Sequence, residues 1–230
     1  MRKKQRFVTG FFALALTIMM LVHGFASASP VEITDIDGNR YKTVTIGTQV
    51  WTQTNLNVTH YRNGDPIRYA KTAKEWYDAA RKGEGAWAFY NNDPRNGKKY
   101  GRLYNWYAVN DPRGLAPKGS RVPGDKEWSV LTEQLGGEAL AGGKMKEVNS
   151  VLWEKPNAGA ESKSEFNALP GGLRGINGNF YFIKKSAYFW SSLEYGQKMA
   201  HYRLINFHVP SIINSAEEKR DGMSVRCIVD

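Results

Sequence analysis

The single cysteine, Cys227, constrains this 230-residue chain most, because a domain with one cysteine cannot form an internal disulfide. Its fold must therefore be held by an apolar core. Seven Trp, twelve Tyr and ten Phe make up 13% of the chain, and each can bury a large apolar area. We expect Cys227 to pack in this core as a small hydrophobe. Four tryptophans are also expected there: Trp106, Trp128, Trp153 and Trp190.

Residues 1–28 have the order of a secretory signal peptide. Four basic residues within the first six precede an apolar run from Phe11 to Val22, and Ala26-Ser27-Ala28 ends the segment. The apolar run is about 12 residues long, whereas a helix needs roughly 20 to cross a bilayer. We therefore expect cleavage after Ala28, no transmembrane segment after cleavage, and export to the cell envelope or the medium.

The remaining residues, 29–230, have the length of a single domain. The leader carries four of the 32 basic residues, so 28 basic and 22 acidic residues remain, a net charge of +6. The basic residues are interspersed with acids, as in Glu217-Glu218-Lys219-Arg220. Nucleic-acid binding needs clustered cations, so no nucleic-acid partner is expected.

The N-terminal pattern after the leader predicts a small antiparallel meander. Asp37-Gly38 separates two strand-like runs and is typical of a hairpin turn. Gly47-Thr48 marks a second turn, which leads to Val50 and Trp51. The first strands should therefore be neighbours in one sheet.

Two helices have clear start and stop signals. Thr72 and Glu75 match a capping box, and Gly83 is a stop signal. Asp125 is the expected cap of a second helix, which ends at Gly136-Gly137. Apolar residues recur at helical spacing within both segments.

The C-terminal half predicts short strands separated by Gly and Asn turns. Residues 103–109 are predicted as a third helix, and residues 136–165 as a long loop. With strands at both ends, the pattern indicates an α+β fold whose termini meet in one sheet. The expected strands of this half cover residues 166–169, 180–183, 188–191, 201–207 and 224–229.

Ordered sequence blocks also carry a resemblance to a known family. They include Ile46-Gly47-Thr48-Gln49-Val50-Trp51, Tyr100-Gly101-Arg102-Leu103-Tyr104-Asn105-Trp106, Arg121-Val122-Pro123 with Glu127-Trp128, Phe189-Trp190-Ser191-Ser192 and Ser224-Val225-Arg226-Cys227. In this order they resemble the Fibrobacter succinogenes major paralogous domain over essentially the whole chain after the leader. The resemblance implies no particular activity.

The later blocks are similar to the C-type-lectin-like superfamily, including its formylglycine-generating branch. That resemblance implies an α+β, C-type-lectin-like fold with antiparallel sheets, two or three short helices and long loops. The oxidase chemistry of the formylglycine branch uses a pair of cysteines, which one cysteine cannot provide. The chain departs from the Fibrobacter family pattern at Thr54, which replaces Glu, and at Ser120, which replaces Trp.

The sequence offers no strong catalytic constellation. His60, His201 and His208 lack zinc-site spacing and a cysteine partner. Ser191 and Ser192 lack the Gly-x-Ser-x-Gly context of a nucleophile, so we interpret them as a buried strand that turns a corner.

The segment rich in Trp, Tyr and Asn is the main candidate for binding. Aromatic faces stack on sugar rings, while amides donate directional hydrogen bonds. Trp87, Phe89 and Tyr90 lie among Gly and Asn turns and are expected to be exposed. The candidate ligand-binding residues are Trp87, Phe89, Tyr90, Asn91, Asn92 and Glu161.

No cofactor is expected. Some side chains of the long loop could nevertheless act as ligands of Ca²⁺. Asn157, Glu161 and Asn167 supply oxygen ligands of the type that Ca²⁺ prefers, without a strict motif.

These features favour an exported, non-catalytic module that binds a glycan, a cell-wall component or a surface protein. One alternative is an extracellular enzyme that acts on polysaccharide, with Glu161 or Glu165 as acid or base. A second alternative is a structural surface module without a small ligand.

Overall fold

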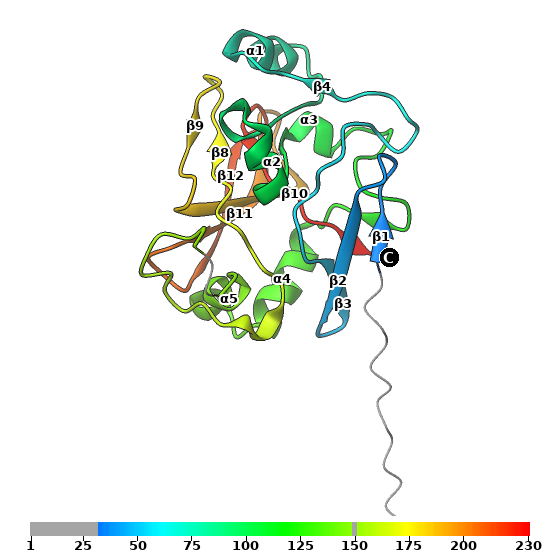
Figure 1. Ribbon diagram of the computed structural model, residues 1–230. Coiled ribbons are helices and arrows are strands. Elements are labelled where there is room, and N and C mark those ends of the chain that lie inside the picture. The colour runs from blue at the N-terminus through cyan, green and yellow to red at the C-terminus, as the bar shows by residue number, and fades with distance from the viewer. Residues whose placement is uncertain (1–31, 149–150) are drawn as a thin grey trace, which may run out of the picture.

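The structure, a computed structural model, describes residues 32–148 and 151–230, and the predicted signal peptide lies outside them. Over the described residues the chain forms a mixed α+β fold with three sheets and five α-helices (Figure 1). This agrees with the expected α+β class. Within the described part of the chain, no helix is both long and apolar enough to cross a membrane.

The first sheet joins the two ends of the chain, as predicted. The C-terminal strand β14 pairs antiparallel with β3 on one side and with β7 on the other. The expected meander forms its N-terminal part. In spatial order the strands are β1 (Glu32–Thr34), β2 (Arg40–Ile46), β3 (Gln49–Thr52), β14 (Ile228–Val229) and β7 (Ser120–Arg121).

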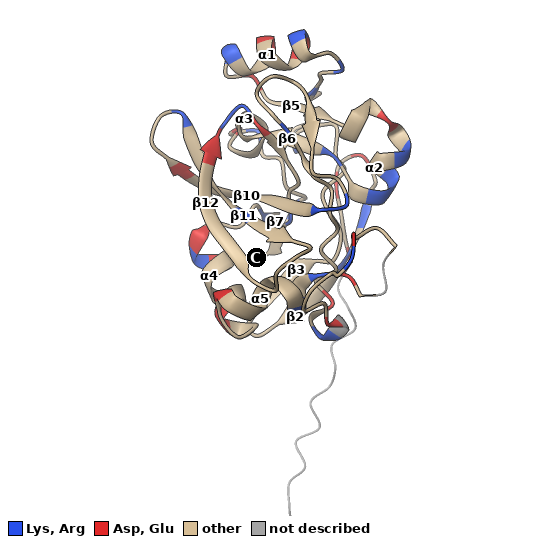
Figure 2. Ribbon diagram, turned by 90° about the vertical axis from the view of Figure 1, so that its left-hand side faces the viewer, with Lys and Arg blue, Asp and Glu red and all other residues tan. Residues whose placement is uncertain are grey.

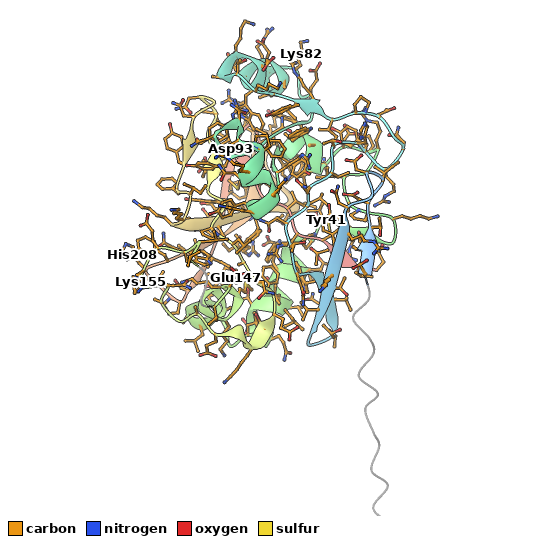
Figure 3. The ribbon with its side chains drawn as sticks, viewed as in Figure 1. Tyr41, Lys82, Asp93, Glu147, Lys155 and His208 are labelled. Carbon is orange, nitrogen blue, oxygen red and sulfur yellow. The ribbon has the colours of Figure 1, made fainter. Side chains whose placement is uncertain are left out.

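Both predicted turns of the meander are present, and a different feature stabilises each of them. The Asp35 carboxylate accepts hydrogen bonds from the backbone N–H of Asp37 at 3.0 Å and of Asn39 at 2.9 Å. It also accepts one from the Tyr41 hydroxyl at 2.6 Å. Figure 3 labels Tyr41 beside β2. In the second turn Gly47 has φ +62°, a left-handed conformation that favours glycine.

The second sheet has six short strands, and residues from the C-terminus lie in its centre. β13 (Gly222–Met223) pairs with β6 on one side and β8 on the other. Only the pair β4 and β5 is parallel. The other strands are β4 (Arg68–Tyr69), β5 (Ala86–Ala88), β6 (Leu103–Asn105), β8 (Leu173–Arg174) and β9 (Phe180–Tyr181).

The third sheet consists of β10 (Ser186–Tyr195), β11 (Met199–Asn206) and β12 (Ile212–Glu218). The sequence predicted β10 and β11 but not β12, whose residues 213–215 are exposed and so lack a buried apolar alternation. The register between β10 and β11 shifts between Trp190 and Glu194. Ser191 and Ser192 therefore lie at an irregularity, which is the corner that was expected.

The first predicted helix is α1 (Ala73–Arg81), and its capping box is complete. The Thr72 hydroxyl accepts from the Glu75 N–H at 3.1 Å, and the Glu75 carboxylate accepts from the Thr72 N–H at 2.8 Å. These two bonds satisfy donors that a helix start otherwise leaves free.

The second predicted helix is α4 (Asp125–Gln134), but Asp125 does not cap it. The Glu127 carboxylate accepts from the Gly124 N–H at 2.9 Å instead. The Asp125 carboxylate lies 2.9 Å from a guanidinium nitrogen of Arg203 on β11, so it ties the helix to the third sheet.

Two expected elements differ in the structure. Residues 103–109 are not one helix, because Asn105 ends β6 and caps the short helix α3 (Trp106–Val109) by accepting from the Ala108 N–H at 3.1 Å. The expected loop 136–165 contains α5 (Glu138–Met145) and the 3-10 turn η2 (Ser162–Ser164). The glycines inside α5 lower its helix propensity, so the sequence did not predict a helix there.

The segment 166–169, expected as a strand, makes only one isolated bridge, between Ala168 and Lys146. The remaining helical elements lie between β5 and β6. They are η1 (Tyr90–Asn92) and α2 (Pro94–Tyr100).

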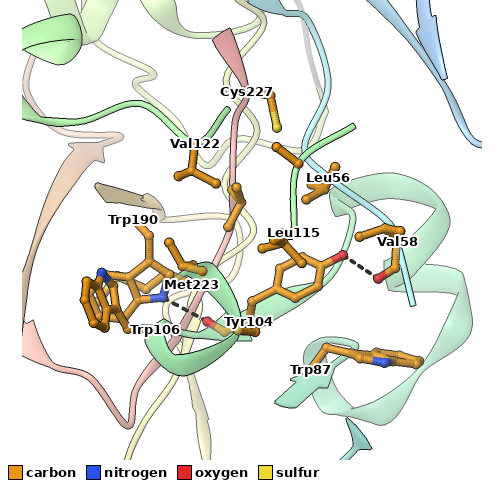
Figure 4. Packing of buried hydrophobic residues seen from close by; sticks show 14 of the residues in the cluster. Leu56, Val58, Trp87, Tyr104, Trp106, Leu115, Val122, Trp190, Met223 and Cys227 are labelled. Carbon is orange, nitrogen blue, oxygen red and sulfur yellow. Dashed lines mark hydrogen bonds between the residues drawn. The ribbon is translucent and has the colours of Figure 1, made fainter. Parts of the chain in front are cut away.

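All seven tryptophans are buried, with 0–6% of their surface exposed. The four predicted as core residues are among them. Trp190 donates its indole N–H to the Tyr104 carbonyl at 2.8 Å, and the Tyr104 hydroxyl donates to the Val58 carbonyl at 2.7 Å (Figure 4). Cys227 is also fully buried, as predicted, and burial raises the pKa of its thiol to about 12.

Arg226 connects the C-terminal segment to the rest of the core. It is fully buried, and its guanidinium donates to the Asn55 side-chain oxygen at 2.6 Å and to the Thr52 and Phe166 carbonyls at 2.7 Å. It also donates to the Asn167 carbonyl at 3.0 Å. These bonds hold residues 166–167 against the first sheet without a strand ladder.

Candidate functional site

The predicted aromatic segment is largely inside the protein. Trp87 and Tyr90 are each 6% exposed, so the expectation that they are exposed is wrong, and Phe89 is half-buried. The reason is that β5 pairs with β4 on one side and β6 on the other. The Trp87 ring stacks on Tyr69, with centroids 4.1 Å apart and an interplanar angle of 2°. The Arg102 guanidinium lies 4.3 Å from the Trp87 ring centroid.

The two asparagines of the segment form a tight turn. Asn91 and Asn92 have φ of 53° and 55°, a left-handed conformation that Asn tolerates better than most residues. Asn92 donates its amide to the Lys71 carbonyl at 2.6 Å, so it already holds the backbone. Asn91 is exposed.

Glu161 is exposed and lies apart from these residues. It lines a hollow of about 360 Å³ together with Gly47, Gln134, Lys144 and Lys163. This hollow is at the end of the molecule that carries α5 and the β2–β3 turn, whereas the aromatic segment is at the α1 end (Figure 1). The structure therefore does not bring the six predicted binding residues together.

The candidate Ca²⁺ ligands are also held by other contacts. Asn157 donates its amide to the Glu147 carbonyl at 3.3 Å, and its side-chain oxygen is buried without a hydrogen-bond partner among the described residues. The Asn167 carbonyl accepts from Arg226. No group of three or more His, Cys, Asp or Glu within the described residues could hold a metal ion.

A different group of aromatic rings reaches the surface. It consists of Tyr181, Phe182, Tyr188 and Tyr202, which we call the aromatic row. Successive ring centroids are 5.9, 6.1 and 5.9 Å apart. Tyr188 and Tyr202 are 8% and 9% exposed and belong to the core, whereas Tyr181 is 36% and Phe182 50% exposed. The row therefore runs from the edge of the core to solvent.

The strands place these rings side by side. Trp190 is opposite Tyr202 in the β10–β11 register, so Tyr188, two residues before Trp190, is on the same face as Tyr202. Phe182 follows β9 and has φ +64°. That conformation is a strained one for a bulky side chain, and strain of this kind is concentrated at functional sites.

Polar groups lie beside the buried end of the row. Ser215 on β12 is opposite Tyr202, and its hydroxyl is hydrogen-bonded to the Tyr202 side chain. The Glu217 and Asp221 carboxylates are close enough to raise the pKa of both Tyr188 and Tyr202, although burial is the larger cause. The surface thus combines ring faces, a hydroxyl and two carboxyl groups.

Asp221 is the most perturbed acid of this group. It is 7% exposed, and burial, with Glu217 and Glu218 nearby, raises the pKa of its carboxyl to about 7. The Ile176 N–H and Arg220 oppose this shift. The carboxyl is therefore partly protonated near neutral pH and can donate as well as accept a hydrogen bond.

The sequence contained one signal for the aromatic row. Residues 180–183 were predicted as a strand, and the pair Tyr181-Phe182 follows a Gly and Asn turn at residues 177–179, as aromatic residues do in the segment from Trp87 to Asn92. Nothing in the sequence indicated that Asp221, next to a run of exposed-type charges, would be buried beside these rings.

The two departures from the family pattern lie in different environments. Ser120 is buried, and its hydroxyl donates to the Pro117 carbonyl at 2.8 Å. Thr54 is exposed and lines a hollow between β2 and α2. Of the two, only Thr54 borders an open space that could take a ligand.

The chain was compared with known proteins. A search of curated proteins found no match, and a search of solved structures found none either. The family model described as the Fibrobacter succinogenes major domain matches residues 44–229, which include all three sheets except β1 and residues 40–43 of β2. The chain therefore belongs to the Fibrobacter succinogenes major domain family.

Proposed function

We propose that this protein is an exported, non-catalytic module that binds a glycan through the aromatic row. The observation that carries the proposal is the position of Phe182, which is 50% exposed and contacts Tyr181 on one side and the buried Tyr188 on the other. An exposed aromatic ring that is held from behind by other rings loses little conformational freedom when it binds.

The chemistry of the surroundings supports a sugar. The C–H faces of a pyranose pack on aromatic rings, while its hydroxyl groups both donate and accept hydrogen bonds. Glu217 accepts such bonds, and the Asp221 carboxyl, with a pKa near 7, does both. An apolar ring beside mixed polar groups is the composition expected of a sugar-binding surface.

We further propose that the protein acts in the cell envelope or outside the cell, and that its fold is related to C-type-lectin-like domains. The signal-peptide pattern of residues 1–28 supports the first proposal. The pairing of β14 with β3, which brings the two ends of the chain together, supports the second.

A glycan array followed by titration calorimetry tests the binding proposal. Phe182→Ala should weaken binding of the best array ligand about fivefold, since an aromatic contact contributes about 1 kcal/mol. Tyr77→Ala is the matched control, because Tyr77 on α1 is also 50% exposed and lies outside the row. If the Phe182 and Tyr77 variants bound the ligand equally well, the aromatic row would not be the binding surface.

A second candidate function is hydrolysis of polysaccharide, favoured by the two carboxyl groups beside the row. A protonated Asp221 near a second carboxyl group, that of Glu217, is the kind of pair that glycosidases use as general acid and base. The acids suggested by the sequence lie elsewhere: Glu161 lines the hollow near α5, and Glu165 accepts from Gln53 at 3.3 Å. Release of reducing ends that is abolished in Asp221→Asn would establish the enzyme; binding without any release would favour the module.

A further inference from the structure

A second open space lies between β2, the segment after β3, and α2. It has a volume of about 230 Å³. We call it the basic hollow, because three cations and no carboxylate line it. Its lining also includes Tyr41, Thr54, Asn55, Asn57 and Tyr100, and the cations are Arg40, Lys98 and Lys99.

The two lysines of the basic hollow are not neutralised by the protein. Lys98 and Lys99 are exposed in the last turn of α2, and neither forms an ion pair with any described residue. Figure 2 shows the basic residues of α2 in blue. Arg40 has one partner, Glu32, at 3.3 Å, in a pair whose side chains are 75% and 39% exposed. Such an exposed pair is weak, so Arg40 can also face an anion.

The floor of the hollow is rigid. Asn55 donates to the Tyr100 carbonyl at 2.8 Å and accepts from Arg226 at 2.6 Å. The Tyr41 hydroxyl donates to Asp35 and accepts from the Asn57 N–H at 3.0 Å. These groups already form hydrogen bonds within the protein. They therefore fix the shape of the hollow and do not rearrange around a ligand.

One polar atom of the lining remains without a partner. The side-chain oxygen of Asn57 is buried and receives no hydrogen bond from any described residue. A buried acceptor without a donor is costly, but this atom is closed to the hollow and does not contact a ligand there. Thr54 is exposed at the edge and carries a hydroxyl, so the lining provides cations for an anionic group and a hydroxyl for a polar one.

We propose that the basic hollow binds a sugar unit that carries a carboxylate, such as a hexuronate. Lys98 and Lys99 face the carboxylate, and the Thr54 hydroxyl at the edge of the hollow bonds a ring hydroxyl. The volume is below the range of about 300–1,000 Å³ typical of sites for drug-sized ligands, which fits a single sugar unit. This site is separate from the aromatic row and does not depend on the function proposed for it.

Thr54 makes the charge argument testable. It is exposed at the edge of the hollow, so Thr54→Glu would add a carboxylate beside the lysines without disturbing the core. That carboxylate would neutralise the lysines and repel the ligand.

The test is calorimetric titration of the purified chain with trigalacturonate at low ionic strength. Lys98→Gln combined with Lys99→Gln should weaken binding about tenfold, and Thr54→Glu by at least as much. Binding should also weaken as salt increases, because the contact is partly exposed. The control is Lys82→Gln: Lys82 lies beside α1, away from Tyr41 and the hollow (Figure 3), and the substitution should leave the affinity unchanged.

Two further ligands and one variant separate the outcomes. Neutral galactotriose should not bind at the hollow, and Phe182→Ala should leave trigalacturonate binding intact, so failure at one site does not imply failure at the other. The proposal is overturned if trigalacturonate does not bind, or if Lys82→Gln weakens it as much as the Lys98 and Lys99 changes. Inorganic phosphate binding as tightly as the sugar would show a general anion site and overturn the assignment to a uronate. Melting curves confirm that each variant is folded.

Discussion

Arg226 holds residues 166–167 against the first sheet, where no strand pairing does so. Its guanidinium donates to four oxygens from two separate segments and lies 4.5 Å from the centroid of the Phe166 ring. Burial lowers the pKa of this guanidinium to about 9, and it remains the cation around which these oxygens are arranged. A buried charge of this kind is tolerated because its donors are satisfied.

Replacing Arg226 with Met should destabilise the fold strongly. The change leaves the Asn55 side-chain oxygen and three carbonyls without their donor, which we expect to cost about 3–5 kcal/mol. Urea denaturation followed by Trp fluorescence measures this. Arg95→Met is the control, because the Arg95 side chain is 87% exposed and pairs only at the surface; its effect should stay within about 0.5 kcal/mol. Equal effects of the two changes would contradict the role given to Arg226.

Asp221 should make stability depend on pH in an identifiable window. Its carboxyl pKa is raised from 3.8 to about 7, so between these values the folded protein retains a proton that the unfolded chain releases. The free energy of unfolding should therefore fall as pH rises from about 4 to 7, by up to about 4 kcal/mol at roughly 1.4 kcal/mol per pKa unit.

The measurement for Asp221 is a difference between two proteins. Asp221→Asn removes the titrating group, so the stability of the wild type relative to this variant should decline over that pH range and be level below it. Every other residue is the same in both proteins, so the difference reports the change at Asp221. A constant difference across the range would mean that the Asp221 pKa is ordinary.

At the scale of elements, the sequence predicted the segments that are stabilised by residues close to one another in the chain. The capping box of α1, the turn at Gly47 and the apolar face of α4 each depend on residues within one or two turns of each other. By contrast, α5 and β12 could not be predicted, because α5 contains Gly142 and Gly143 in its interior and β12 has little apolar alternation. They form where they do because they pack against one another.

Gly142 should behave unlike an ordinary helix glycine. A Gly→Ala change inside a helix usually stabilises it by about 1 kcal/mol. Here a Cβ at residue 142 would lie 2.2 Å from the Ser211 carbonyl oxygen, next to β12. We expect Gly142→Ala to destabilise the protein by about 1–3 kcal/mol, as overpacking does.

The denaturation midpoint in urea reports the sign of the Gly142 effect. Leu140→Ala on the same helix is the comparison, since Leu140 is 48% exposed and both residues favour helices. If Gly142→Ala raised the midpoint, α5 would not pack as closely on β12 as the structure indicates.

At the scale of the whole molecule, composition predicted the core better than the site. The tryptophans are buried because a chain without an internal disulfide relies on its apolar core and each tryptophan buries a large apolar area, a requirement that does not depend on the order of residues. The site depends on which strands become neighbours. Tyr188 reaches Tyr202 only through the pairing of β10 with β11, and Phe182 reaches Tyr188 through the turn in which the Ser186 N–H donates to the Phe182 carbonyl. Trp87 and Tyr90 were predicted as exposed because the pairing of β5 on both sides could not be foreseen.

The position of β14 has a consequence for how the protein reaches its native state. β14 lies between β3 and β7, and β13 lies between β6 and β8, so two sheets receive an interior strand from residues 222–230. Without these residues each of the two sheets is left in two parts, with an unpaired strand edge on either side of the gap. Both sheets therefore close only through contacts of long sequence separation, which are formed slowly, and residues 222–230 link the two closing steps.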